Sequence, residues 1–286
     1  MKTIKQVLII SLFLTGLFSC PAFAQEEREH NRFNRSNDDE DEKTLPPVQY
    51  KVPNSAVIKK VVIKDLIAEI KIIGSTGNEI VIDAKGLEGI PERAKGLKPL
   101  YASGCMDNTG AGIAANESGG VLTICGASKG SEDAHYVITL PKGVSLSIDY
   151  NSPFANEDIE INDMEGEVEA STLTADIKCK NVTGPLVLNS TSGDIEVNIS
   201  KINQNSPTSI SLISGDLDIT IPANSPANLE LNTITGSAYT DFDIKMDSKD
   251  GNLKRIGGND IETKLNGGGV NLSLSCTSGN IYLRKK

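Results

Sequence analysis

The sequence predicts an all-β protein, a right-handed β-helix-like solenoid of short stacked strands. Three observations favour this fold class. From Val48 onwards apolar and polar residues alternate with a period of two, which is typical of strands. Glycine is plentiful, at 26 of 286 residues. A glycine-containing corner motif also returns at a spacing of nine residues over successive blocks after Ser145, and such fixed spacing indicates stacked repeats.

The first 24 residues have the features of a secretory signal peptide. Lysines precede an apolar run over Val7–Ser19, and an A-x-A signal ends at Ala24, so we expect cleavage between Ala24 and Gln25. The run is shorter than the ~20 residues of a membrane-spanning helix, so no transmembrane segment is expected. Leu17–Cys20 offers an alternative, in which Cys20 carries a lipid anchor. The sequence favours cleavage and leaves the anchor open.

Residues 25–47 are polar and rich in acids, which predicts a disordered acidic linker ahead of a β domain over residues 48–286. The whole chain has a net charge of −10. A chain with this charge is repelled by phosphate backbones and anionic lipids, so nucleic acid is excluded as a partner. An export signal places the protein in the periplasm, on the cell surface or outside the cell.

The cysteines fit an oxidising compartment. If Cys20 leaves with the signal peptide, four remain, and four thiols allow three pairings. Cys105 and Cys125 flank an expected glycine-rich loop and hairpin, which makes them the first candidates for a disulfide. Cys179 and Cys276 alternate with apolar strand residues, so we interpret them as small buried hydrophobic residues.

The first part of the domain is predicted to contain strands near residues 57–63, 67–73 and 80–82. A short helical turn is expected within Pro91–Leu100, and a hairpin with its turn at Glu117–Gly120 is expected before residue 125. The segment Lys85–Gly120 is otherwise irregular. Long excursions from a regular scaffold often carry binding, so this segment is the expected interaction surface.

The repeat follows the template Ser/Thr-Gly-Asp/Asn/Glu-aliphatic-x-aliphatic. We expect glycine to provide a positive φ at each corner and the polar neighbour to bond nearby amides. The aliphatic residues that follow, such as Ile195 and Val197, then stack from rung to rung. A β-sandwich is the alternative, but near-identical corners favour a coil. The predicted structural corners are Gly166, Gly184, Gly193, Gly215, Gly236, Gly269 and Gly279.

Several motifs carry a resemblance to a known family: Tyr136–Gly143, corners such as Ser192–Ile195, the glycine run within Leu265–Gly269, and the ending Ser278–Leu283. With these motifs the chain resembles, from about Val57 to Leu283, the putative-adhesin family of exported bacterial β-strand-repeat proteins. The resemblance implies a right-handed β-helix-like solenoid on or near the cell envelope. It implies no catalytic residues, because the family's domain has no established function.

No catalytic, cofactor-binding or metal-binding residue is predicted. The two histidines, His30 and His135, are isolated, and the common nucleophile, zinc, phosphate-loop and EF-hand motifs are missing from the sequence. We therefore expect a non-enzymatic, adhesin-like binding or structural module of the envelope without a cofactor. Its partner is left open as an envelope or extracellular glycan or protein, and the oligomeric state is open too.

The alternative is a carbohydrate-active β-helix enzyme acting on an extracellular polysaccharide, since paired carboxylates can cleave glycosidic bonds. The acids on neighbouring predicted rungs are Asp194, Glu196, Asp216 and Asp218. Turn capping accounts for Asp194 and Asp216, and a solvated strand face accounts for Glu196 and Asp218. Tyr239 and Tyr282 follow repeat corners and are candidates for lining one side of the coil or for packing between rungs.

Overall fold

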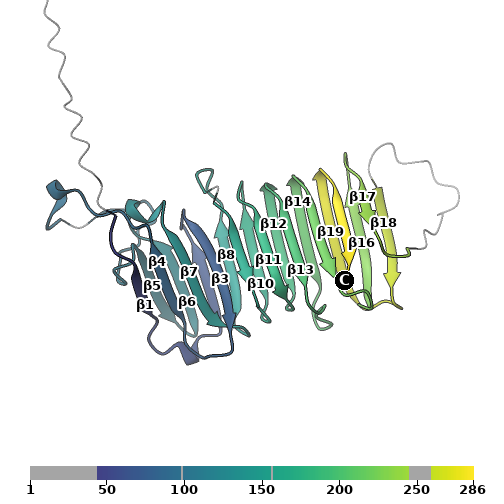
Figure 1. Ribbon diagram of the computed structural model, residues 1–286, viewed down its shortest axis with the longest axis horizontal. Coiled ribbons are helices and arrows are strands. Elements are labelled where there is room, and N and C mark those ends of the chain that lie inside the picture. The colour runs from purple at the N-terminus through teal and green to yellow at the C-terminus, as the bar shows by residue number, and fades with distance from the viewer. Residues whose placement is uncertain (1–43, 98, 156, 245–258) are drawn as a thin grey trace, which may run out of the picture. The chain divides into compact units, whose positions relative to one another are not determined.

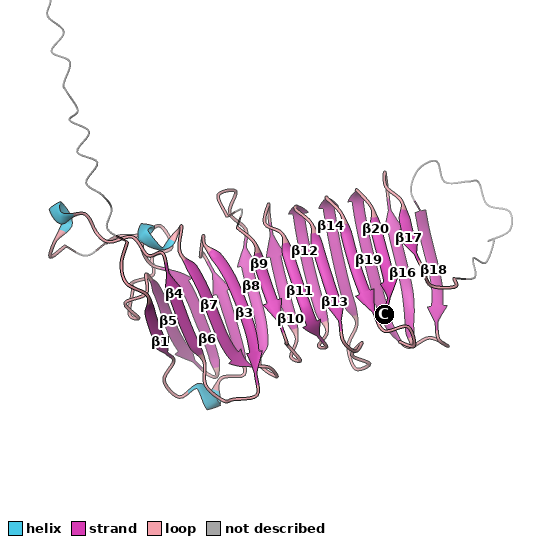
Figure 2. Cartoon of the chain, viewed as in Figure 1, coloured by secondary structure: helices cyan, strands magenta, loops and turns pink. Residues whose placement is uncertain are grey.

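The computed structural model describes residues 44–97, 99–155, 157–244 and 259–286, which form an all-β structure (Figures 1 and 2). The all-β class predicted from the sequence is confirmed. The predicted signal peptide with its Ala24–Gln25 cleavage site, Cys20 and most of the predicted linker lie outside the described residues. Three short 3-10 turns are present in the described part: η1 (Ser55–Val57), η2 (Glu92–Ala94) and η3 (Lys129–Ser131).

The described strands form two ten-stranded sheets. In spatial order sheet 1 contains β1 (Val48–Lys51), β4 (Val81–Lys85), β7 (His135–Pro141), β3 (Glu69–Ser75), β9 (Ile159–Asn162), β11 (Ile177–Val182), β13 (Ile195–Ile199), β15 (Leu217–Ile221), β20 (Ile281–Lys285) and β17 (Ala238–Thr240). Sheet 2 contains β18 (Asn259–Leu265), β16 (Ala227–Thr233), β19 (Val270–Ser278), β14 (Thr208–Ser214), β12 (Leu186–Ser192), β10 (Val168–Thr172), β8 (Ser145–Tyr150), β2 (Lys60–Lys64), β6 (Val121–Gly126) and β5 (Ile113–Ser118).

From β8 to β15 the chain passes alternately between the two sheets, and neighbouring strands within each sheet are parallel. Ile177 pairs with Ile195, eighteen positions further along, and Ile195 pairs with Leu217. The nine-residue spacing in the sequence is therefore half of one turn of this coil. Successive corners lie alternately at opposite edges, and every second corner stacks on the previous one.

In most of the described strands alternate residues point into a core shared by both sheets. In sheet 1 the inward positions Ile195, Leu217 and Ile281 lie side by side in neighbouring strands, and each is at most 1% exposed. The expected burial of Ile195 and Val197 is thus confirmed. Each such side chain contributes about 1.5–3 kcal/mol of transfer free energy, so the ladder is a main stabilising feature of the coil.

The corner glycines form two columns because successive corners approach each other closely. Gly193, Gly215, Gly279 and Gly236 stack at one edge, and Gly166 and Gly184 stack at the other. A β-carbon at Gly215 would lie 2.7 Å from the carbonyl oxygen of Gly193, and one at Gly184 would lie closer still to that of Gly166. A side chain at these corners would therefore collide with the backbone of the next rung.

The expected positive φ is found at only three of the seven predicted corners, namely Gly193, Gly215 and Gly279. The prediction is wrong for Gly166, Gly184, Gly236 and Gly269, where φ lies outside that region. At Gly166, Gly184 and Gly236 the backbone of a neighbouring rung lies so close that only glycine fits. Gly269 belongs to neither column: it lies between β18 and β19, where a β-carbon would be 2.8 Å from the carbonyl oxygen of Pro226.

Both ends of the sheets depart from sequence order. The pair β19 and β20 lies between β14–β15 and β16–β17, and β18 is antiparallel to β16. At the other end β4 is antiparallel to β7, and β5 forms the predicted hairpin with β6. The strand expected from Val57 begins only at Lys60, because Ser55–Val57 forms a 3-10 turn. The expected turn within Pro91–Leu100 is present as η2.

Candidate functional site

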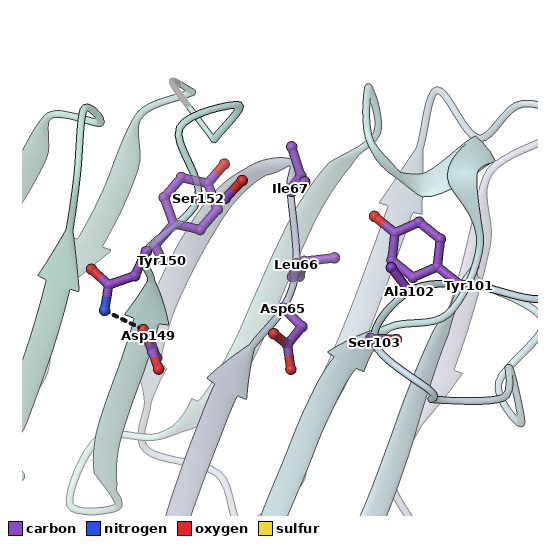
Figure 3. Close-up of a pocket in the computed structure, with 10 residues that line it drawn as sticks. Asp65, Leu66, Ile67, Tyr101, Ala102, Ser103, Asp149, Tyr150 and Ser152 are labelled. Carbon is purple, nitrogen blue, oxygen red and sulfur yellow. Dashed lines mark hydrogen bonds between the residues drawn. The ribbon is translucent and has the colours of Figure 1, made fainter.

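A pocket of about 410 Å³ lies where three parallel strands of sheet 2 end side by side (Figure 3). Strands β8, β2 and β6 are neighbours in that order, so their carboxyl ends share one edge. The turn Asp65–Ile67 follows β2, and Asp149–Ser152 lies at and beyond the end of β8. The third wall is Tyr101–Ser103, from the irregular segment between β4 and β5. We call this hollow the edge pocket.

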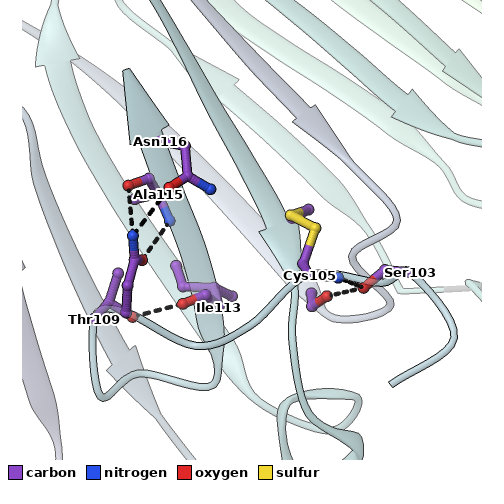
Figure 4. Close-up of a disulfide and its surroundings, with 9 residues drawn as sticks. Ser103, Cys105, Thr109, Ile113, Ala115 and Asn116 are labelled. Atoms are coloured by element: carbon purple, nitrogen blue, oxygen red, sulfur yellow. Dashed lines mark hydrogen bonds between the residues drawn. A yellow bond between two sulfur atoms is a disulfide. The ribbon is translucent and has the colours of Figure 1, made fainter. Parts of the chain in front are cut away.

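The third wall belongs to residues 86–112, which we call the disulfide loop. Cys105 in this loop is joined to Cys125 at the end of β6 by a disulfide (Figure 4). Ser103 Oγ donates a hydrogen bond to the carbonyl oxygen of Gly126 at 2.5 Å. The buried Tyr136 hydroxyl donates to the carbonyl oxygen of Ala111 at 2.7 Å. These contacts attach the loop to the core next to the pocket.

Asp107 and Asn108 shape the loop between the disulfide and β5. The carboxylate of Asp107 accepts hydrogen bonds from the backbone N–H groups of Thr109, Gly110 and Gly112, at 2.8 to 3.0 Å. Asn108 bonds both the N–H and the carbonyl of Ala115, at 2.9 and 3.1 Å. Such local side-chain bonds favour turns over strands, which explains why this segment leaves the regular sheet.

Two tyrosines of the edge pocket have different roles. Tyr150 is buried, and its hydroxyl donates to the carbonyl oxygen of Ala68 at 2.7 Å and accepts from its N–H at 3.1 Å. The hydroxyl of Tyr101, which is partly buried, donates to Glu132 Oε1 at 3.0 Å. Burial, followed by the bond to Glu132, raises the pKa of Tyr101 to about 12, so the phenol is neutral at physiological pH. Tyr150 fixes the floor, and Tyr101 provides a positioned ring.

The charged residues that line the edge pocket are all acids. Asp65, held in a left-handed backbone conformation at φ 50°, accepts no side-chain hydrogen bond from any described residue. Asp149 accepts one from Asn151 Nδ2, at 2.5 Å. No lysine, arginine or histidine is among the described lining residues. The pocket therefore offers hydrogen-bond acceptors and disfavours anions.

A second hollow of about 410 Å³ shares Ile67 with the edge pocket. Its other lining residues include Phe154, which is 77% exposed, and a single base, Lys129. Glu132, Asp133 and Glu157 make its charge predominantly negative. The same edge thus combines an exposed aromatic side chain with a negatively charged surface.

The acids considered for catalysis lie elsewhere, on the coil. Asp194, Glu196, Asp216 and Asp218 line one hollow of about 220 Å³ together with Tyr282. Asp194 Oδ1 accepts the N–H of Asp216 at 2.8 Å, and Asp216 Oδ1 accepts the N–H of Asn280 at 2.8 Å. Two of the four carboxylates therefore join successive corners.

The outward acids sit on neighbouring strands, where Glu196 pairs in register with Asp218. Arg284 bonds both carboxylate oxygens of Asp218, at 2.8 to 3.0 Å. The rings of Tyr239 and Tyr282 stack with their centroids 5.4 Å apart, and Arg284 lies 5.6 Å from the centre of Tyr282. The two tyrosines thus do line the outer face of sheet 1, and they pack on each other there.

The other residues considered as candidates from the sequence, Cys179, Cys276 and His135, take part in packing and in strand pairing. Cys179 and Cys276 are buried free thiols on inward positions of β11 and β19. His135 pairs with Glu69 across β7 and β3 at the surface. Within the described residues, no group of three or more histidine, cysteine or acidic side chains has a metal-binding arrangement. Nor does any helix in this part of the chain have the length and apolar character needed to span a membrane.

Sequence reasoning placed the binding surface within Lys85–Gly120, and Tyr101–Ser103 of that segment do line the edge pocket. It missed Asp65, Asp149 and Phe154. The sequence predicted a strand that ends near Asp65 but none that ends near Asp149, and it carried no sign that β8 lies next to β2 rather than next to β6. That adjacency alone brings Asp65 and Asp149 to one hollow.

A family model and a solved structure match this chain. A comparison with curated proteins finds no match. The crystal structure of a putative cell adhesion protein from Clostridium sporogenes is 12% identical, covers 84% of this chain and 100% of that chain, and has a TM-score of 0.41. A likeness this loose supports no argument. The family model described as Toastrack DUF4097 matches residues 155–284, which span the regular coil, so this part of the chain is similar to members of that family.

Proposed function

We propose that this protein is an exported, non-enzymatic binding module of the cell envelope, similar in role to an adhesin. The coil is its scaffold, and the edge pocket with the disulfide loop is its binding surface. The edge pocket carries this proposal, since it combines a positioned aromatic ring, a carboxylate that accepts no hydrogen bond from the described residues and short polar side chains in one hollow. The disulfide supports an oxidising compartment, because such bonds persist mainly outside the cytoplasm.

The proposed organisation is a signal peptide over residues 1–24, an acidic linker over residues 25–47 and a β-solenoid over residues 48–286. We infer a right-handed coil, because parallel crossover connections are right-handed in nearly all proteins. The intact mass of the exported chain tests the N-terminal part. A mass that begins at Gln25 supports cleavage after Ala24, and a mass that begins with a lipid-modified Cys20 replaces release by an anchor.

A second candidate function, a carbohydrate-active enzyme, rests on the hollow that contains four carboxylates. The contacts in that hollow favour a structural role. Asp194 and Asp216 accept backbone N–H groups of the next rung, and Asp218 forms a two-pronged pair with Arg284. Asn280 occupies the next position of the same column, where no carboxylate is needed. The binding function therefore has the stronger support.

The experiment measures retention of the purified protein on the insoluble envelope of its source cells and on a panel of neutral and acidic polysaccharides. Tyr101→Ala is expected to reduce retention, whereas Tyr239→Ala, which removes an exposed tyrosine of the coil, leaves it unchanged. Circular dichroism checks that both variants are folded. Equal retention by wild type and Tyr101→Ala overturns the proposed surface. New reducing or unsaturated ends that disappear in Asp194→Asn or Asp216→Asn establish the enzyme instead.

A further inference from the structure

We propose that the edge pocket binds a pyranose residue of a neutral or amino sugar and excludes acidic sugars. This inference rests on the proposed function, since it names the ligand class of the same surface. It follows from the size of the pocket, the position of one aromatic ring, the pattern of hydrogen-bond acceptors and the sign of the local charge.

The volume of the pocket suits a small ligand. At about 410 Å³ it lies within the range of roughly 300–1,000 Å³ that is usual for small-molecule sites. The hollow is bounded on both sides, by Tyr101–Ser103 and by Asp149–Ser152, with Asp65–Ile67 between them (Figure 3). A six-membered sugar ring fits such a space, and the rest of an oligosaccharide can continue towards the neighbouring hollow beyond Ile67.

Tyr101 provides an apolar surface for the C–H groups of a pyranose. Its ring is held at its outer end by the hydroxyl bond to Glu132 and at its backbone end by the disulfide loop, which Ser103 bonds to Gly126. A ring that is already positioned loses little conformational entropy when a ligand packs on it. Aromatic rings that combine an apolar body with a polar tip are favourable at wet binding surfaces.

The polar groups of the pocket match sugar hydroxyls. Asp65 has acceptor oxygens that no described residue uses, and Asp149 accepts only the bond from Asn151. Ser152 Oγ accepts a weak bond from the N–H of Phe154, at 3.3 Å, and keeps its own proton available. Hydroxyl groups, which both donate and accept, can satisfy this mixture better than a ligand that only accepts.

Charge decides which sugars fit. The acidic side chains that line the pocket are Asp65 and Asp149, and the neighbouring hollow adds three acids against Lys129. A carboxylate or phosphate on the ligand is therefore repelled, whereas an ammonium group is attracted. Among saccharides this order favours amino sugars, then neutral sugars, and disfavours uronic acids.

Isothermal titration calorimetry with the full exported chain tests the order. The probes are the β-1,4-linked tetramers of glucosamine and of N-acetylglucosamine, a tetramer of galacturonic acid, and tetralysine as a control for charge alone. We expect the glucosamine tetramer to bind tightest, the N-acetyl form more weakly and the galacturonate not at all. Asp65→Asn, which keeps the shape and removes the charge, should reduce the preference for glucosamine by about threefold to fivefold.

The variants separate this inference from the proposed function. Tyr101→Ala is expected to weaken both sugars about tenfold or more, as truncation of a central aromatic residue usually does, and Tyr101→Phe should retain most of the affinity. If Tyr101→Ala abolishes retention on envelopes while no sugar tetramer binds, the ligand class is wrong and the surface stands. If the tetramers bind Tyr101→Ala as tightly as wild type, the sugar assignment of this pocket is wrong, and if envelope retention of that variant is also unchanged, the proposed surface fails too. Tighter binding of galacturonate, or of tetralysine than of either sugar, also overturns the inference.

Discussion

The two parts of the domain use the same residue types in different ways. In the coil after residue 155, Asp194 and Asp216 each bind the N–H of the next rung, so their carboxylates are part of the scaffold. In the part before residue 155, Asp65 lies in the turn directly after β2 but accepts no side-chain bond from the described residues. Regular stacking uses polar groups for structure, whereas interrupted stacking leaves some available for a ligand.

The bonds that hold the turns and loops in place also differ between the two parts. In the coil, backbone bonds such as the one from Gly193 N–H to the Ser214 carbonyl, at 3.2 Å, join a corner to the next rung. In the first part, a disulfide and the side chains of Asp107 and Asn108 hold the excursion instead. The Toastrack match covers residues 155–284 only, so the edge pocket lies on the part of the domain that precedes the matched coil.

The largest expected effect comes from the coil's glycine column. Gly215→Ala places a β-carbon 2.7 Å from the Gly193 carbonyl oxygen at a φ of 125°, so we expect a loss of about 3–5 kcal/mol in the free energy of unfolding. The control is Gly143→Ala, where no atom lies within 4 Å and φ is not positive, with a change within about 0.5 kcal/mol. Urea denaturation measures both. Equal losses would show that the corners are not tightly stacked.

Removal of the disulfide is expected to have the next largest effect. The bond joins residues 20 positions apart, for which chain entropy predicts about 3 kcal/mol. The double change Cys105→Ser and Cys125→Ser should therefore lower the melting temperature of the protein. Reductant should destabilise the wild type and leave the double variant unchanged. A wild type that is insensitive to reductant would remove the disulfide from this account.

The aspartates give a matched comparison between the two parts. Asp216→Ala loses acceptor contacts to Asn280 and should cost about 1–2 kcal/mol, whereas Asp216→Asn keeps an acceptor oxygen and should cost under about 0.5 kcal/mol. Asp65→Ala should cost less, under about 1 kcal/mol, because this carboxylate accepts no hydrogen bond from the described residues and the remaining cost is that of alanine in a left-handed backbone conformation. If Asp65→Ala costs as much as Asp216→Ala, the distinction between structural and available carboxylates fails.

The smallest expected signal is the reaction of the two free thiols. Burial raises the pKa of Cys179 to about 12 and also raises that of Cys276, so both remain protonated at pH 8. Alkylation at pH 8 followed by peptide mass spectrometry should find neither modified in the native protein and both modified in denaturant. Rapid labelling of either one in the native protein would show that the coil core opens readily.

The regular part of the fold was predictable from local pattern, because each half-turn repeats one corner and one alternating strand. The departure from sequence order at the ends of the sheets was not predictable from local pattern, because β16 and β19 pair although their residues lie more than 40 positions apart in the sequence. The edge pocket was only partly predictable. Residues 85–120 indicated an excursion, but the meeting of Asp65 with Asp149 depends on the adjacency of β2 and β8. The reason for several corner glycines was also hidden, because rung spacing rather than φ excludes a side chain there.

Hydrogen–deuterium exchange of the protein with and without the glucosamine tetramer tests most directly whether the interrupted part, and not the coil, recognises the ligand. We expect slower exchange in peptides that cover residues 65–67, 100–105 and 149–154, with no change in β13, β15 and β20. Protection confined to those three coil strands, next to the hollow of Asp194 and Asp218, would contradict the account and move the functional surface to the coil.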